Sequence, residues 1–182
     1  MRLRPAIACL ALLGAGCTHR QPAFPAPIPA VPGSPVTAFS LRYIDISQGA
    51  GALAEPRKCY YADYTGWLTD GKEFDSSHDT TAQGKPRDPI TFPQGAHRVI
   101  TGWDVGFEGM HVGGARRLII PYQLAYGERG RPPVIPERAT LVFDVHLLAQ
   151  ADTLPRTDAA PAARGAPPRC PPWSSVGAGI AR

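Results

Sequence analysis

Aromatic and branched apolar residues recur beside turn glycines between Tyr64 and Leu148, where few residues could act as a nucleophile or metal ligand. The blocks read Tyr64-Thr65-Gly66, Asp70-Gly71-Lys72-Glu73-Phe74-Asp75-Ser76-Ser77, Val99-Ile100-Thr101-Gly102-Trp103, Ala125-Tyr126-Gly127-Glu128-Arg129-Gly130 and Ala139-Thr140-Leu141-Val142-Phe143-Asp144-Val145. The histidines show no metal-ligand spacing, and Ser76-Ser77 lacks the glycines of a nucleophile elbow. This combination indicates a site that works by shape and dehydration rather than by covalent chemistry.

The elements that must position these side chains are mostly short strands. Alternation and β-branched or aromatic content predict strands at Phe39–Ile46, Lys58–Leu68, Lys72–Ser76, Ile90–Phe92, Ala115–Ile120 and Thr140–Leu148. Thr101 is a candidate cap for a short helix that starts near Gly102 or Trp103 and ends near Met110. One antiparallel sheet with one short helix is an α+β design, and the pattern predicts a pocket between the helix, the sheet and the loop 121–139.

Proline divides the 182 residues into a folded unit and two tails. Six of the 21 prolines lie in 22–35 and six in 155–172. Proline fixes φ and lacks an N–H, so neither stretch favours regular structure. We therefore predict a Pro-rich linker over 18–36, a folded domain over 37–150 and a disordered Pro- and Ala-rich tail over 151–182.

The net charge of +4 belongs to the tails. Residues 37–150 hold 12 Lys and Arg against 13 Asp and Glu, which gives that segment a formal charge of −1. A nearly neutral domain has no electrostatic footprint for nucleic acid, so no nucleic-acid partner is expected.

Residues 1–17 resemble a bacterial lipoprotein signal. A short basic segment precedes the apolar stretch 6–15, which is too short to span a bilayer, and small residues then lead to Cys17. Gly14 departs from the large aliphatic residue usual three places before the cysteine, and ordinary secretion or an uncleaved anchor are the alternatives. The resemblance implies lipidation of Cys17 and a membrane-attached protein of the cell envelope that faces the periplasm.

Cys59 and Cys170 remain after the signal. Export permits a disulfide between them. We nevertheless expect Cys59 to be a small buried strand residue and Cys170 a free tail thiol, because the Pro-rich tail gives Cys170 no reason to approach the domain.

The blocks quoted above, in their order, resemble the FKBP family of peptidyl-prolyl cis-trans isomerases over essentially all of 37–150. This resemblance implies a bent antiparallel sheet of five or six strands wrapped around one short helix, with an apolar pocket between them. It implies no cofactor or metal. Its expected ligands are proline-containing polypeptides and macrolides.

The resemblance also implies a role for each matching residue. Trp103 would form the pocket floor and Tyr64, Phe74 and Phe143 its walls. Val99 and Ile135 would complete the lining, and the Ile100 N–H and the Tyr126 hydroxyl would bind peptide carbonyls. Asp75 would sit at the rim beside the Tyr64 hydroxyl. The catalytic set is thus Asp75, Tyr126 and Tyr64.

Three positions depart from the family pattern. Ile90 stands where an aromatic wall is usual. The loop 76–89 is longer than in the minimal domain, and Arg87 is the candidate salt-bridge partner of Asp75. Residues 131–134 lie in a variable loop. The leading hypothesis is an isomerase that assists folding of exported proteins. The alternatives are a binding module that holds proline-containing segments without useful turnover, and an envelope lipoprotein whose tails carry the function.

Overall fold

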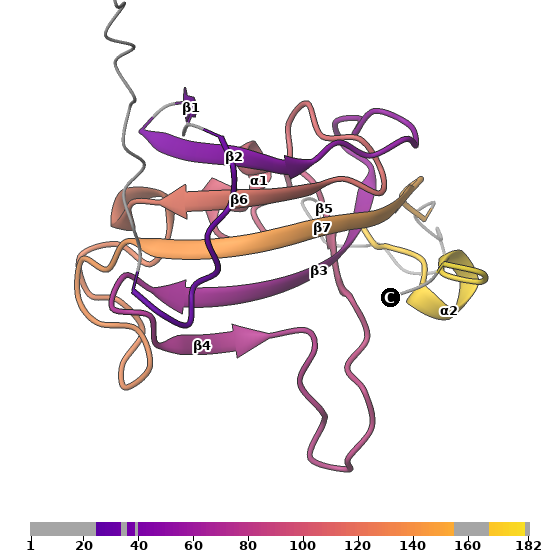
Figure 1. Cartoon of the computed structure of the whole chain (residues 1–182). Helices are drawn as coiled ribbons and strands as arrows, with labels where there is room; N and C mark the ends of the chain where they lie inside the picture. Colours follow the sequence, from indigo (N-terminus) through magenta and orange to yellow (C-terminus); the bar gives the residue numbers. More distant parts are fainter. Residues whose placement is uncertain (1–24, 34–35, 39, 155–167, 181–182) are drawn as a thin grey trace, which may run out of the picture.

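A computed structural model describes residues 25–33, 36–38, 40–154 and 168–180. Its centre is a seven-stranded antiparallel sheet in the order β1-β2-β6-β7-β3-β4, with β5 paired to β3 beyond that path (Figure 1). The strands are β1 (Val36–Ala38), β2 (Leu41–Ser47), β3 (Cys59–Leu68), β4 (Glu73–Ser76), β5 (Ile90–Pro93), β6 (Ala115–Ile120) and β7 (Leu141–Ala151). The α+β class is confirmed. The strand number exceeds the expected five or six.

Strand β3 organises the sheet because it pairs along its whole length with β7 and shares its other edge between β4 and β5. Its residues alternate between two environments. Tyr60 and Ala62 join the main core, whereas Cys59 and Tyr61 join a second cluster on the opposite face. The turn from β3 to β4 closes where the Leu68 N–H donates to the Lys72 carbonyl at 2.9 Å and Gly71 takes a φ of 91°.

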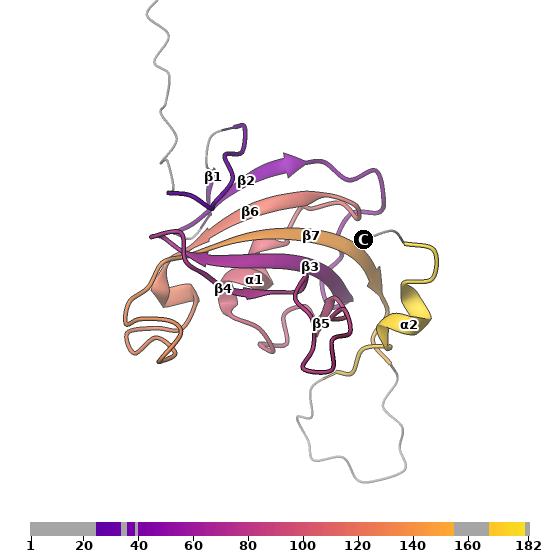
Figure 2. The same cartoon turned by 60° about the horizontal axis from the view of Figure 1, so that its bottom comes forward.

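Helix α1 (Thr101–Gly106) packs against the concave face of the sheet (Figure 2). A Cβ at Gly102 would lie 2.4 Å from Ile120 Cγ2, so the glycine lets the helix approach β6 closely. The core between helix and sheet contains Phe92, Phe107 and Leu118 among its buried members. The predicted cap was wrong. The helix begins at Thr101, Ile100 occupies the N-cap without a side-chain hydrogen bond, and turns replace the expected helix after Gly106.

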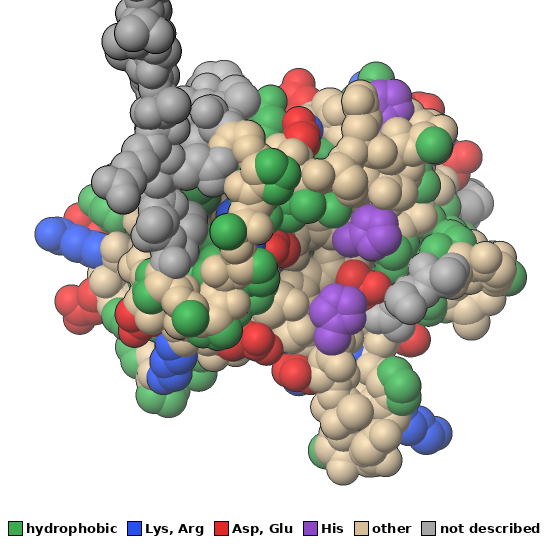
Figure 3. All heavy atoms as spheres, in the orientation of Figure 1, with side chains coloured by type: hydrophobic (Ala, Val, Ile, Leu, Met, Phe, Trp, Pro, Cys, Tyr) green, Lys and Arg blue, Asp and Glu red, His purple; other side chains and the backbone are tan. Residues whose placement is uncertain are grey.

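The other face of the sheet is crossed by residues 25–33, part of the predicted linker (Figure 1). Ile28 is buried with Trp67 and Val142, and the Pro29 carbonyl accepts a hydrogen bond from Arg117. Arg117 itself forms a two-point ion pair with Asp144 at 2.6 and 2.7 Å. Figure 3 shows this face with hydrophobic, polar and charged side chains interspersed over its described part. This segment of the linker therefore belongs to the folded unit.

Residues 168–180 also return to the sheet, so the prediction of disorder was wrong for that part of the tail. Cys170 forms a disulfide with Cys59, with a Cα–Cα distance of 5.6 Å, and the expected free thiol is therefore also wrong. The Tyr61 hydroxyl donates to the Pro171 carbonyl at 2.8 Å. Trp173 opens the short helix α2 (Trp173–Val176), and its ring lies 5.7 Å from that of Tyr61. The covalent bond and this apolar contact hold a segment that has few local structural preferences.

None of the helices in the described residues is long and apolar enough to cross a membrane. The predicted signal and its Cys17 lie outside the described residues.

Candidate active site

A pocket of about 220 Å³ opens where α1, β3, β4 and the loops after β5 and β6 meet. It is lined by Tyr64, Phe74, Asp75, Ile90, Arg98, Val99, Ile100, Trp103, Tyr126, Arg131 and Phe143. Every residue predicted for the catalytic set lines this pocket, and so does every predicted substrate-binding residue except Ile135. The sequence blocks, far apart along the chain, are thus brought together at one hollow.

Trp103 lies at the base of an aromatic cluster. It is 3% exposed, and its ring centroid lies 5.1 Å from that of Tyr64 and 5.3 Å from that of Phe143. Phe74 meets Phe143 edge-on at 5.5 Å. Such edge-to-face contacts fix the orientation of each ring, so the floor and walls form a preshaped apolar surface.

Gly66 leaves room for these walls. It lies in β3 between Tyr64 and Leu68, and a Cβ there would come within 2.7 Å of Phe143 and 2.8 Å of Phe74. Any side chain at this position would press on both rings. The Tyr-x-Gly spacing in the sequence is therefore a packing requirement of the pocket.

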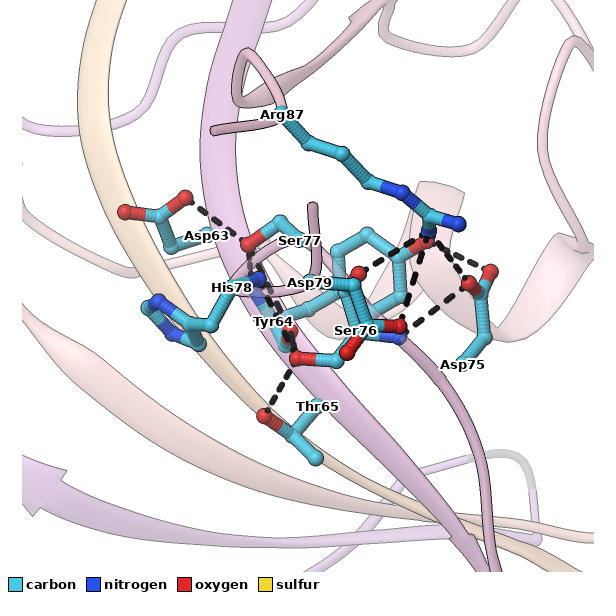
Figure 4. Close-up of polar contacts among 9 residues, drawn as sticks. All are labelled: Asp63, Tyr64, Thr65, Asp75, Ser76, Ser77, His78, Asp79 and Arg87. Carbon is cyan, nitrogen blue, oxygen red and sulfur yellow. Dashed lines mark hydrogen bonds and ion pairs between the residues drawn. The ribbon is translucent and has the colours of Figure 1, made fainter. Parts of the chain in front are cut away.

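One carboxylate lies at the rim, between a tyrosine and an arginine (Figure 4). The Tyr64 hydroxyl donates to Asp75 Oδ2 at 2.6 Å, and Arg87 Nη1 donates to Asp75 Oδ1 at 2.9 Å. Arg87 also donates to the Ser76 carbonyl at 3.0 Å. The predicted contact between Asp75 and Arg87 is confirmed. The long loop 77–89 thus carries Arg87 back to β4.

Burial raises the pKa of the Tyr64 phenol well above its usual value of 10.0, and the hydrogen bond to Asp75 raises it further. The phenol therefore stays protonated at physiological pH and remains a hydrogen-bond donor. Ser77 holds the strand that carries Asp75, because its hydroxyl donates to Asp63 at 2.8 Å and accepts from the Tyr64 N–H at 3.0 Å. Ser77 serves to join strands.

Two residues with hydrogen-bond donors line the pocket from separate segments. Ile100 stands just before α1 with extended backbone angles, and its N–H finds no acceptor among the described residues. Tyr126 follows the 3₁₀ turn η1 (Tyr122–Leu124), where the Gly127 N–H closes back on the Tyr122 carbonyl at 2.8 Å. Its hydroxyl likewise has no partner within the described part of the chain. Both groups are free to bind a carbonyl oxygen.

Ile135 lies beside the pocket rather than in it. It is 3% exposed and lines an adjoining hollow of about 410 Å³, together with Phe74, Asp75, Tyr126, Arg131, Pro132, Pro133 and Val134. The two hollows share Phe74, Asp75, Tyr126 and Arg131, so they lie side by side. Sequence reasoning did not place Arg98 or Arg131 at the site, since an exposed arginine in a loop carries no periodic signal.

Comparison with known proteins identifies the class. The sequence pattern of the family described as FKBP-type peptidyl-prolyl cis-trans isomerase matches residues 52–148. The chain therefore belongs to this family of isomerases, as the order of its blocks predicted.

Particular relatives agree with this assignment. An FK506-binding protein of Neisseria meningitidis serogroup A is 47% identical over 109 residues, which cover 60% of this chain and 94% of the relative. FK506-binding protein 4 of Dictyostelium discoideum is 48% identical over 111 residues, 61% of this chain but 28% of the relative.

Solved structures show the same fold. FkpA from Escherichia coli superimposes with a TM-score of 0.55 at 37% identity, covering 65% of this chain and 52% of FkpA. AtFKBP13 gives a TM-score of 0.55 at 36% identity and covers 62% and 94% of the two chains.

Proposed function

We propose that this protein accelerates cis-trans isomerisation of X–Pro bonds in exported polypeptides of the cell envelope, where a lipid on Cys17 holds it at a membrane. The observation that carries the activity is the aromatic pocket around Trp103, with hydrogen-bond donors at its edge. The exported setting rests on the sequence 1–17 and is supported by the disulfide, since such bonds persist in oxidising compartments.

The pocket suits the energetics of the reaction. Rotation about an X–Pro bond breaks amide resonance, against a barrier of about 18–20 kcal/mol. The twisted bond has lost its partial double-bond character and is less polar than the planar ground state. A dry pocket walled by Tyr64, Phe74 and Phe143 favours the twisted form over the planar one, which is differential binding of the transition state.

The donors would hold the substrate while the bond turns. A carbonyl next to the proline would accept from the Ile100 N–H, and the Tyr126 hydroxyl would hold a second one. Asp75 would fix the orientation of the Tyr64 ring in the pocket wall through their 2.6 Å hydrogen bond. No group needs to gain or lose a proton. A macrolide that fills the same pocket would compete with the peptide.

The activity is tested by a proline-isomerisation assay on residues 18–182 with peptides of varied X. Acceleration that weakens in Tyr126→Phe and in Trp103→Leu supports the assignment. Peptide binding without acceleration by a folded protein would favour the binding module, for which the aliphatic Ile90 at the pocket wall is the specific reason.

The location is tested separately. Cells that express the full chain would be labelled with a radioactive fatty acid and fractionated, beside a Cys17→Ser variant. Label and membrane association that both disappear in Cys17→Ser support the lipid anchor. A Cys17→Ser protein that stays in the membrane fraction would contradict it.

A further inference from the structure

Two arginines at the mouth of the pocket have no role in the mechanism above. Arg98 lies two residues before Ile100, and Arg131 lies in the loop between η1 and β7. Both side chains are exposed, and both line the pocket. Arg131 also lines the adjoining hollow, so it lies at the junction of the two.

These arginines differ from the paired arginines of the fold. Arg87, Arg116, Arg117 and Arg138 each contact a carboxylate, at distances from 2.6 to 3.1 Å. Neither Arg98 nor Arg131 has a side-chain partner among the described residues. Their positive charges are therefore available to a ligand.

The charge around the pocket is also opposite in sign to that of the domain. Asp75 is the one acid among the residues that line either hollow, and it is already bonded to Arg87 and Tyr64. Arg98 and Arg131 thus give the mouth an excess of positive charge on a segment, 37–150, with a formal charge of −1. Positive charge beside a concave apolar surface attracts an anionic ligand and disfavours a cationic one.

We propose that this pocket selects X–Pro segments with an acidic side chain next to the proline. The inference rests on the proposed isomerase activity and names its substrate class. With the proline ring over Trp103, a neighbouring residue of the polypeptide enters the adjoining hollow, whose apolar wall is Pro133, Val134 and Ile135. A Glu or Asp at that position would reach Arg131 at the junction, while Arg98 would attract it from the side of α1. Lysine there would be repelled.

The test measures kcat/KM on matched peptides that carry Glu, Gln, Lys or Leu directly before the proline, and on a second set that carries them directly after it. The wild type is expected to favour Glu over Gln in one set and to disfavour Lys in the same set. In an Arg98→Gln/Arg131→Gln double variant the Glu-to-Gln ratio should fall by about three- to tenfold, the range expected for two exposed ion pairs. Salt at about 1 M should reduce the wild-type ratio in the same direction.

Two control variants separate the causes. Arg98→Lys/Arg131→Lys keeps both charges and should retain most of the preference. Arg57→Gln removes an exposed arginine that does not line the pocket and should leave every ratio unchanged. Catalysis absent from every peptide, including Leu-Pro, would refute the proposed function. Normal catalysis with the same Glu-to-Gln ratio in the wild type and the double glutamine variant would refute this inference alone.

Discussion

The Tyr64 hydroxyl donates a 2.6 Å hydrogen bond to Asp75 Oδ2, while Arg87 holds the other carboxylate oxygen at 2.9 Å. The chain Tyr64–Asp75–Arg87 links a pocket wall on β3 to the loop 77–89 through β4 (Figure 4). The orientation of an aromatic wall is thus set by an ion pair that lies at the surface.

Replacing Asp75 with Asn should lower kcat/KM by about three- to tenfold, since a charge-assisted hydrogen bond to Tyr64 becomes a neutral one. The free energy of unfolding should change by less than about 1 kcal/mol, because the ion pair with Arg87 is half-exposed to solvent. Isomerisation and urea-unfolding assays measure the two effects. Arg87→Gln, which leaves Tyr64 and Asp75 bonded, should cost less activity. A larger loss in Arg87→Gln than in Asp75→Asn would contradict the role given to Asp75.

Gly66→Ala should damage the pocket more than the fold. The new methyl group would meet Phe143 at 2.7 Å and Phe74 at 2.8 Å, so both rings must move. We expect a loss of stability of about 1–3 kcal/mol, typical of overpacking, and at least a tenfold fall in kcat/KM. Gly84→Ala is the control, because a Cβ there meets nothing within 4 Å and only the backbone conformation is strained. Full activity in Gly66→Ala would show that the two rings do not shape the catalytic surface.

Loss of the disulfide should destabilise the domain without stopping catalysis. The bond joins residues 111 positions apart, and closing a loop of that size is worth about 4–5 kcal/mol in the chain-entropy account. Cys170→Ser should therefore lower the free energy of unfolding by about 3–5 kcal/mol, measured by urea unfolding. Its isomerase rate should stay near that of the wild type under conditions where it is folded, because Cys170 lies outside the pocket.

Trp173→Ala provides the matched comparison. It keeps the disulfide and removes the ring that packs 5.7 Å from Tyr61, so it should cost about 1–3 kcal/mol at this exposed edge. Equal stability of Cys170→Ser and the wild type would mean that the disulfide contributes nothing to the folded state, and equal stability of Trp173→Ala and the wild type would mean the same for the ring contact.

The sequence predicted the pocket residues better than it predicted the terminal segments and the start of the helix. Tyr64, Phe74, Trp103 and Phe143 lie in blocks whose order along the chain is distinctive, and these residues meet at one hollow. The partner of Asp75 was also predictable, since Arg87 lies in the one loop that joins β4 to β5.

The errors have physical causes. Residues 168–180 show no periodicity, and their position depends on one bond between Cys59 and Cys170 that no local pattern encodes. The linker residue Ile28 is likewise buried through a contact with Trp67 that is distant in sequence. At the helix, Ile100 takes the cap position and the helix begins at Thr101, because the second helical residue, Gly102, packs closely against Ile120.

Stability should fall at alkaline pH through Tyr60, a core residue that is 2% exposed and donates to the Glu55 carbonyl at 2.9 Å. Burial, followed by the negative charges of Glu108, Glu55 and Asp104, raises the pKa of Tyr60 from 10.0 to about 12. In the unfolded chain this phenol ionises near its usual pKa of about 10. Unfolding therefore releases a proton when the pH lies between these two values. The contribution of the buried, protonated Tyr60 phenol to stability is complete below about pH 10 and is lost as the pH rises toward 12.

Urea unfolding of the wild type and Tyr60→Phe from about pH 8 to about pH 12 tests this linkage. At pH 8 the Phe variant should be less stable by about 1 kcal/mol, since it lacks the hydrogen bond to Glu55. Above pH 10 the wild type should lose stability more steeply, because only its phenol can ionise on unfolding, and the gap between the two proteins should close. The remaining tyrosines titrate equally in both proteins and cancel in the difference. Two curves that stay parallel across this range would mean that Tyr60 ionises in the native protein as readily as in the unfolded chain.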